Sequence, residues 1–185
     1  MTGAVGITLD PDADPALARA AELVRDVPDF PQPGILFRDI TPVLADGEAF
    51  TTVATELAAL VGDADVVVGI EARGFLLGAA AAVVAGTGVV PVRKAGKLPV
   101  VAASHTYRLE YGTATLELPA DTLRPGSRAF LIDDVLATGG TAAAACGLLA
   151  EVGVEVTGFA TLLAIGALNG RQQLGDVPVH VLLHA

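Results

Sequence analysis

Short apolar runs, each long enough for one buried strand, alternate with helical segments along most of this chain. Apolar runs bounded by turn signals are typical of strands that are buried on both sides, and helices between them favour parallel connections. The pattern predicts an α/β fold in which helices cover both faces of a parallel sheet. The expected strands are residues 65–70, 88–93, 128–132, 156–163 and 179–183, and the expected helices are 48–61, 74–85, 140–152 and, more briefly, 168–174.

Three segments depart from this alternation. Asp14 and Pro15 have the character of an N-cap and a first helical residue, which predicts an exposed helix over residues 16–27. Residues 28–42 hold four prolines and a glycine, which predicts a stiff loop around a brief strand. Residues 94–118 end in two alternating runs that predict a hairpin. We expect the hairpin to be an excursion from the core.

Size and charge narrow the classes of function. The 185 residues, of which 52% are hydrophobic, fit one domain over residues 1–185 with a sizeable core. A net charge of −10 opposes binding to a nucleic-acid backbone. Four basic residues nevertheless fall close together, which indicates either a local anion site or a solvated loop. These residues are Arg93, Lys94, Lys97 and Arg108.

Location and metal content can also be predicted. Residues 74–92 carry no charge, but four glycines and Pro91 interrupt them, so a buried helix fits better than a membrane span. No basic residue precedes Arg19 and no long apolar segment opens the chain, so we expect no export signal and a cytoplasmic protein. The lone Cys146 agrees with a reducing compartment, and no Cys or His cluster has metal-ligand spacing.

The sequence FLIDDVLATGGTAAAAC, residues 130–146, carries the strongest functional signal. It joins an apolar strand, the acids Asp133 and Asp134 at the expected exposed strand end, a glycine turn and a helix start. Ligands of α/β sheets bind at the carboxyl ends of strands, and the turn over residues 137–141 can aim backbone N–H groups at a phosphate. Carboxylates are good acceptors for sugar hydroxyls. The segment predicts a ribose phosphate site, the alternative being a strand end and a turn without a ligand.

Residues 130–142 resemble the signature with which type I phosphoribosyltransferases bind phosphoribosyl diphosphate. GIEARGFLLG, residues 69–78, resembles that family's loop for the diphosphate group. The resemblance implies the family's fold, an α/β parallel sheet flanked by helices with a small hood and a mobile hairpin loop. The ligands of phosphoribosyl diphosphate that it implies are Arg73, Arg93, Lys94, Lys97, Asp133, Asp134, Ala137, Thr138, Gly139, Gly140 and Thr141.

Three further segments are similar to those of the adenine-specific members of the family, namely residues 30–44, 91–99 and 109–118. The similarity implies transfer of the phosphoribosyl group from phosphoribosyl diphosphate to adenine, giving AMP and diphosphate, as in purine salvage. Its implied partners are these two substrates and a second copy of the chain, in a homodimer whose sites share Arg93. The implied cofactor is Mg²⁺, bound mainly through the substrate, with no metal site in the protein itself.

The same similarity assigns roles within the site. Backbone groups of Leu36 and Arg38 are implied to hold adenine, with Phe37 stacking on one face of the base and Ile165 lining the other. The implied catalytic residues are Asp133 and Asp134, beneath the ribose ring, and Glu110, which with Tyr111 lies on the mobile loop and relays a proton from the base.

Three alanines depart from the family pattern. Ala95 replaces a usual proline, Ala114 a frequent polar residue, and Ala164 a common glutamate, whose loss bears on substrate preference or rate. Two other functions stay open. A non-catalytic sensor of phosphoribosyl diphosphate usually has a DNA-binding domain and basic surface, which this sequence lacks. A transferase for a 6-oxopurine or orotate is disfavoured by the segments around Phe37 and Glu110.

Overall fold

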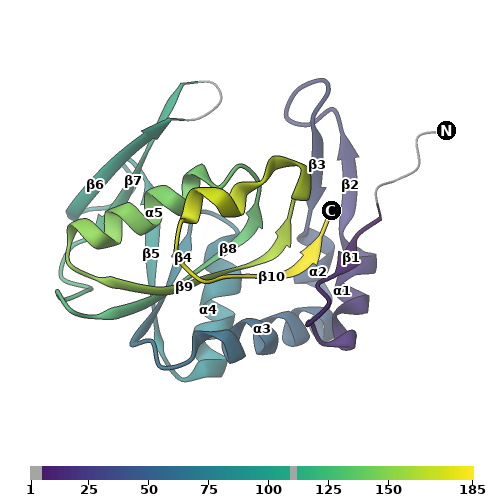
Figure 1. Cartoon of the computed structure of the whole chain (residues 1–185), viewed down its shortest axis with the longest axis horizontal. Helices are drawn as coiled ribbons and strands as arrows, with labels where there is room; N and C mark the ends of the chain where they lie inside the picture. The colour runs from purple at the N-terminus through teal and green to yellow at the C-terminus, as the bar shows by residue number, and fades with distance from the viewer. Residues whose placement is uncertain (1–5, 109–111) are drawn as a thin grey trace.

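An eight-stranded sheet forms the centre of the computed structural model, which describes residues 6–108 and 112–185 (Figure 1). The strands lie in the order β1-β10-β9-β8-β4-β5-β7-β6. From β10 to β5 all neighbours are parallel, as predicted, whereas β1, β7 and β6 are antiparallel additions at the two edges. The strands are β1 (Thr8–Leu9), β4 (Val66–Ile70), β5 (Gly88–Lys94), β6 (Val101–Arg108), β7 (Thr113–Pro119), β8 (Arg128–Leu136), β9 (Glu155–Ala164) and β10 (Val179–His184).

Helices cover both faces of the sheet and bury its apolar side chains. Successive strand residues point to opposite faces, so Val67 packs in the core on the side of α3 and α4 and Val68 in the core on the side of α5. Within the described ranges, no helix is both long and apolar enough to cross a membrane. The α-helices are α1 (Ala18–Leu23), α2 (Thr41–Ala45), α3 (Gly47–Val61), α4 (Gly74–Ala85) and α5 (Gly140–Glu151), and the 3₁₀ helices are η1 (Pro15–Leu17), η2 (Gly166–Leu168) and η3 (Gly170–Leu174).

Three elements differ from their prediction. The helix expected over residues 16–27 ends at Leu23, because Pro28 restricts the residue before it to an extended backbone and residues 25–28 form a strand. Strand β8 continues past Ile132, since its pairing with β9 runs on after its pairing with β4 has ended. The segment expected to be one short helix is two 3₁₀ turns, which Asn169 separates with a left-handed backbone (φ 51°).

Two antiparallel strands, β2 (Arg25–Pro28) and β3 (Leu36–Asp39), form a separate small sheet that we call the hood. Ion pairs between cross-strand neighbours support its register: Arg25 Nη2 lies 2.5 Å from Asp39 Oδ2, and Arg38 pairs with Asp26. The predicted hairpin is present as β6–β7, but the expectation that it stands apart from the core is wrong, because β7 pairs with β5 and buries Leu116 and Leu118. The hood and this hairpin rise at opposite ends of one edge of the main sheet (Figure 1). The carboxyl ends of the parallel strands point into the space between the hood and the hairpin.

Candidate active site

A cavity of about 610 Å³ opens between the hood and the carboxyl ends of β8 and β9. Open α/β sheets bind their ligands at this edge. Its walls come from the hood, the turn before α4, the end of β8 with the following turn, and the segment after β9. The predicted site residues that line it are Leu36, Phe37, Arg38, Arg73, Asp134, Ala137, Thr138 and Ile165.

A second, smaller cavity of about 80 Å³ lies at the start of α5, lined by Asp133 and by residues of the turn from Ala137 to Thr141. Gly139 is the N-cap of α5, its backbone is left-handed (φ 83°), and no side chain caps the helix. The first N–H groups of α5 therefore face the turn without a side-chain acceptor, and the helix dipole favours an anion there. This turn, which we call the cradle, has the geometry expected for a phosphate site.

The cradle rests against η3 through two glycines. A Cβ atom added at Gly139 would lie 2.1 Å from the carbonyl oxygen of Gly170, and one added at Gly170 would lie 2.2 Å from that of Ala137. Both distances are far shorter than any van der Waals contact, so the two backbones meet only because both residues lack a side chain. The sequence analysis missed Gly170, because nothing local indicates a contact with a segment thirty residues away.

The two acids of the motif are buried, which corrects the expectation that they are exposed at a strand end. Asp133 is 9% and Asp134 7% exposed, because β8 continues to Leu136 and places both within the strand. Adjacent strand residues point to opposite sides, and Asp133 lines the cradle while Asp134 lines the larger cavity. Burial raises the pKa of the Asp133 carboxyl well above its usual range, and the neighbouring charge of Asp134 adds to this rise.

Arg73 connects the hood to the acid pair. Its Nη2 lies 2.7 Å from Asp134 Oδ2, its guanidinium carbon lies 4.9 Å from the centre of the Phe37 ring, and its Nη1 donates to the carbonyl oxygen of Arg38 at 3.4 Å. Among the residues described, this buried Oδ2 accepts no hydrogen bond, and Arg73 contacts it as an ion pair. A hydroxyl of a bound sugar would satisfy it. Arg73, predicted to bind diphosphate, here faces Asp134.

Phe37 and Ile165 provide apolar walls of the larger cavity. The half-buried ring of Phe37 is held by Phe30, whose ring centre lies 5.0 Å away at an interplanar angle of 74°. The guanidinium of Arg73 lies over the same ring, so Phe37 is positioned by two neighbours at the wall of the cavity.

Backbone groups of the hood point into the same space. The carbonyl of Arg38 contacts the side chain of Arg73, so its polar backbone groups face away from β2. Because these groups alternate in direction along an antiparallel strand, those of Leu36 face the same way. Opposite Leu36 stands Pro28, which has no N–H to offer. Leu36 and Arg38 thus present the free edge of β3 to the cavity.

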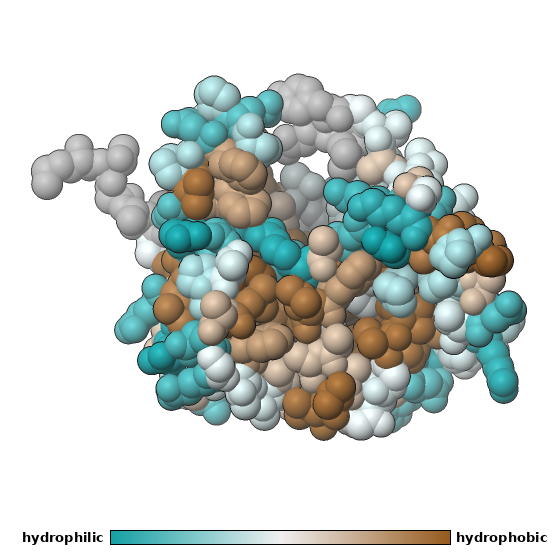
Figure 2. All heavy atoms as spheres, turned by 180° about the vertical axis from the view of Figure 1, so that it is seen from behind, coloured by the Kyte–Doolittle hydropathy of each residue, from teal (hydrophilic) through white to brown (hydrophobic). Residues whose placement is uncertain are grey.

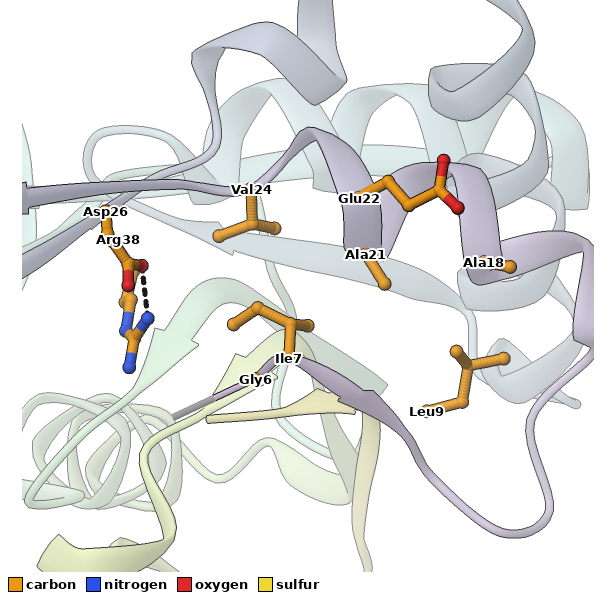
Figure 3. A pocket seen from close by; sticks show the side chains of 9 residues that line it. All are labelled: Gly6, Ile7, Leu9, Ala18, Ala21, Glu22, Val24, Asp26 and Arg38. Atoms are coloured by element: carbon orange, nitrogen blue, oxygen red, sulfur yellow. Dashed lines mark hydrogen bonds and ion pairs between the residues drawn. The ribbon is translucent and has the colours of Figure 1, made fainter. Parts of the chain in front are cut away.

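The side chain of Arg38 lies elsewhere. Figure 3 shows its guanidinium turned toward Asp26, in a separate cavity of about 440 Å³ between the N-terminal strand, α1 and the hood. The Arg38 side chain is only 7% exposed. The backbone of Arg38, and not its side chain, therefore faces the larger cavity. This is the part of the residue to which the resemblance noted in the sequence assigns a role.

Glu71 lies in the diphosphate-loop motif, although the sequence analysis assigned it no role. It contacts three of the residues predicted to bind diphosphate. Its carboxylate pairs with Lys97, accepts from the backbone N–H of Lys94 at 3.1 Å, and accepts from Arg93 Nε at 3.3 Å. Burial acts to raise the pKa of the Glu71 carboxyl, but Lys97, the Lys94 N–H and Arg93 outweigh it, and the pKa lies below its usual value. No local signal marks Glu71, because the basic residues that it contacts lie 22 to 26 positions further along the chain.

The predicted proton relay cannot be placed, because Glu110 and its neighbour Tyr111 lie outside the described residues. A residue close to them along the chain, Tyr107, reaches the cradle from β6, although the sequence analysis gave it no role: its hydroxyl oxygen lies 3.1 Å from Thr141 Oγ1.

Comparison with known proteins yields one family. Residues 43–179 match the sequence family described as the phosphoribosyl transferase domain. An adenine phosphoribosyltransferase of Saccharopolyspora erythraea is 57% identical over 174 residues, 94% of this chain and 95% of that protein. The structure of the Rhodothermus marinus enzyme of that name has a TM-score of 0.87 at 46% identity, covering 92% of this chain and 98% of the other. The Saccharomyces cerevisiae enzyme, solved with adenine and an imino-altritol bisphosphate, has a TM-score of 0.82 at 35% identity, covering 89% and 96%.

Proposed function

This chain belongs to the phosphoribosyl transferase family, and from its relatives and its site we infer that it transfers a phosphoribosyl group from phosphoribosyl diphosphate to adenine, giving AMP and diphosphate. The resemblance to the adenine-specific members is confirmed by these relatives. One observation carries the function: the larger cavity, which we propose holds the base, adjoins the cradle, since Ala137 and Thr138 line both. A ribose 5-phosphate bound in the cradle would therefore present its anomeric carbon toward a base stacked on Phe37.

The reaction forms a bond between N9 of adenine and C1′ of ribose, breaks the bond between C1′ and diphosphate, and releases the N9 proton. Positive charge grows on the ribose as diphosphate departs. Asp133 and Asp134 stand on the strand between the two cavities, where buried carboxylates stabilise that charge. A positive charge nearby favours the ionised carboxylate, which opposes the raised pKa of Asp133.

The leaving diphosphate needs positive charge, and we assign this role to the three basic residues around Glu71. Arg93 and Lys94 end β5, whose carboxyl end lies beside that of β4, and Lys97 follows shortly after. One carboxylate orders their positions without neutralising all three. Glu110 remains our proposed acceptor for the proton of adenine.

Mg²⁺ fits this site as part of the substrate. Over residues 6–108 and 112–185, no three His, Cys, Asp or Glu side chains are grouped to hold a metal ion, and Asp134 already faces Arg73. Mg²⁺ prefers oxygen ligands and is commonly bound by one or two carboxylates together with substrate phosphates. Bound with the substrate, Mg²⁺ would neutralise charge on the leaving diphosphate, and the nearest carboxylates of the chain would be those of Asp133 and Asp134.

The test is product formation. With adenine, phosphoribosyl diphosphate and Mg²⁺, the purified chain is expected to release diphosphate and form AMP in equal amounts. Without adenine, release should fall to the background rate, because no acceptor is present. Binding of phosphoribosyl diphosphate without AMP formation would support the sensor instead.

Helix α4 supports the proposed homodimer. All of its residues are apolar or glycine, yet only one face packs against the sheet. Leu76, Val83 and Val84 of this helix are exposed, at 53%, 80% and 54%, and Val89 in β5 is exposed as well. Figure 2 shows apolar side chains gathered over the lower middle of this side of the molecule. A helix that is hydrophobic all round is normally covered, and a second copy offers a face of the same chemistry.

The same face connects to the predicted shared residue. The guanidinium carbon of Arg93 lies 5.9 Å from the ring centre of Phe75, in the first turn of α4. A partner packed on α4 would therefore approach Arg93. This supports a two-fold dimer in which Arg93 serves the diphosphate in the partner's site, while Lys94 and Lys97 serve the diphosphate of their own chain.

Placing a charge on this face should separate the subunits. A valine gains about 1.5–3 kcal/mol on burial, and a two-fold interface contains each substitution twice, so Val83→Asp is expected to raise the dimer dissociation constant by ~10²-fold or more. Sedimentation over a range of concentrations measures it. Ala59→Asp, which adds the same charge to an exposed position of α3, serves as the control and should leave the dimer intact. A Val83→Asp protein that sediments like the wild type would exclude this face.

A further inference from the structure

Strand β6 lies along helix α5 and touches it with every second residue. Ala103, His105 and Tyr107 are half-buried on this side, while the residues between them are exposed. His105 Nδ1 lies 2.7 Å from Glu151 Oε1, near the end of α5, and its ring packs against Gly147 one turn earlier. The contact thus runs the length of the helix toward its N-terminus.

Tyr107 makes the last of these contacts, at the cradle itself. Its hydroxyl oxygen lies 3.1 Å from Thr141 Oγ1, and its ring lies close to Gly140. Both glycine and threonine belong to the first turn of α5, whose N–H groups form the cradle. A side chain from a different part of the sheet therefore touches the residues expected to hold the 5′-phosphate.

Counting the hydroxyl protons of Tyr107 and Thr141 indicates which of the two donates the hydrogen bond between them. A threonine hydroxyl carries one proton, and a phosphate in the cradle offers only acceptors. When Thr141 donates to that phosphate, its oxygen can still accept, and Tyr107 is the hydroxyl in position to donate to it. The chain from tyrosine to threonine to phosphate then has all its donors and acceptors paired, and each bond polarises the next.

We propose that Tyr107 is a positioning residue for the 5′-phosphate, acting by donating a hydrogen bond that orients the Thr141 hydroxyl toward the cradle. This inference rests on the proposed function for the identity of the ligand. It assigns to β6 a role in holding phosphoribosyl diphosphate and AMP, and none in holding adenine.

The test compares binding of ribose 5-phosphate, measured by calorimetry, in four proteins. Tyr107→Phe keeps the ring and removes the hydroxyl, and is expected to weaken binding about 3- to 10-fold, in the range of one lost hydrogen bond. Thr141→Val is expected to weaken it at least as much. In the double variant the loss should equal that of Thr141→Val alone, because Tyr107 acts only through that hydroxyl.

The hairpin provides a matched control. Thr106 Oγ1 lies 2.8 Å from Thr115 Oγ1, a hydroxyl pair within the hairpin that does not reach the cradle. Thr106→Val should bind ribose 5-phosphate like the wild type, which separates loss of the cradle contact from general loosening of the hairpin. In kinetics, Tyr107→Phe should raise KM for phosphoribosyl diphosphate while leaving KM for adenine unchanged.

Wild-type affinity in Tyr107→Phe, or losses that multiply in the double variant, would overturn the proposal. An equal loss in Thr106→Val would also do so, since the effect would then belong to the hairpin as a whole. The proposed function has a separate readout: a wild-type protein that binds ribose 5-phosphate but forms no AMP contradicts the transferase and leaves the role of Tyr107 standing.

Discussion

Replacing Asp133 and Asp134 together by asparagine is expected to lower kcat by about 10³-fold or more, the scale on which preorganised electrostatic groups act in enzymes. Both carboxylates are buried, Asp133 at the cradle and Asp134 at the larger cavity, and weak solvent screening there strengthens their effect on a developing positive charge. Asparagine keeps the shape and removes the charge. KM values should change much less than kcat, because the lost interaction is made mainly in the transition state.

The single variants should differ in stability. When folding raises the pKa of a carboxyl, the folded protein loses stability as the pH rises above the pKa of that carboxyl in the unfolded chain, which is about 4 for Asp. At neutral pH Asp133→Asn removes that cost, so its Tm should equal or exceed that of the wild type. Asp134→Asn leaves the charge of Arg73 without its partner, so its Tm should fall.

Steady-state kinetics and thermal unfolding together check these results. Asp63→Asn is a suitable control, because Asp63 pairs with Arg128 at the amino-terminal end of the same strand, far from the cavities. It should keep full activity. A double variant with near wild-type kcat would show that the acid pair is structural.

Adenine is expected to be used at least 10⁴-fold better than hypoxanthine or guanine, measured as kcat/KM, since sites built on hydrogen-bond pairing reject analogues that leave their groups unpaired by about this factor. Adenine offers an acceptor at N1 beside an amino donor. One N–H and one C=O on the free edge of β3, from Leu36 and Arg38, can meet both. A 6-oxopurine reverses the pattern and leaves each group unpaired, at roughly 1–3 kcal/mol apiece.

A competition assay with each base, reading nucleotide product, measures this preference. Phe37→Leu is the matched variant: loss of stacking should raise KM for every base, while the ratio between bases stays close to that of the wild type. Ala164, for which the resemblance implies a common glutamate, is 8% exposed and does not line the larger cavity, so we expect its effect on the ratio to be small. Comparable kcat/KM for hypoxanthine or guanine would contradict base selection by the hood and leave phosphoribosyl transfer intact.

The sequence predicted those features whose cause is local. The alternation of apolar strands and helices indicated the parallel strands, and the glycine turn before α5 indicated the cradle. The burial of Asp133 and Asp134 escaped prediction, because the length of β8 is decided by pairing with β9. Glu71 and Gly170 escaped it for the same kind of reason: their roles depend on neighbours that only the folded chain brings to them.

The contact between Gly139 and Gly170 also predicts when the phosphate site forms during folding. The cradle is closed on one side by a turn that follows β9, so a chain in which β9 has not yet paired with β8 has the whole phosphate signature but only part of the phosphate site. That pairing joins strands whose paired residues, such as Arg128 and Glu155, lie 27 positions apart, so we expect it to form after the helices, whose contacts are local. Phosphate affinity should therefore appear late in refolding. A phosphorylated substrate that binds only after this pairing would stabilise the fully folded chain over forms in which β9 is unpaired.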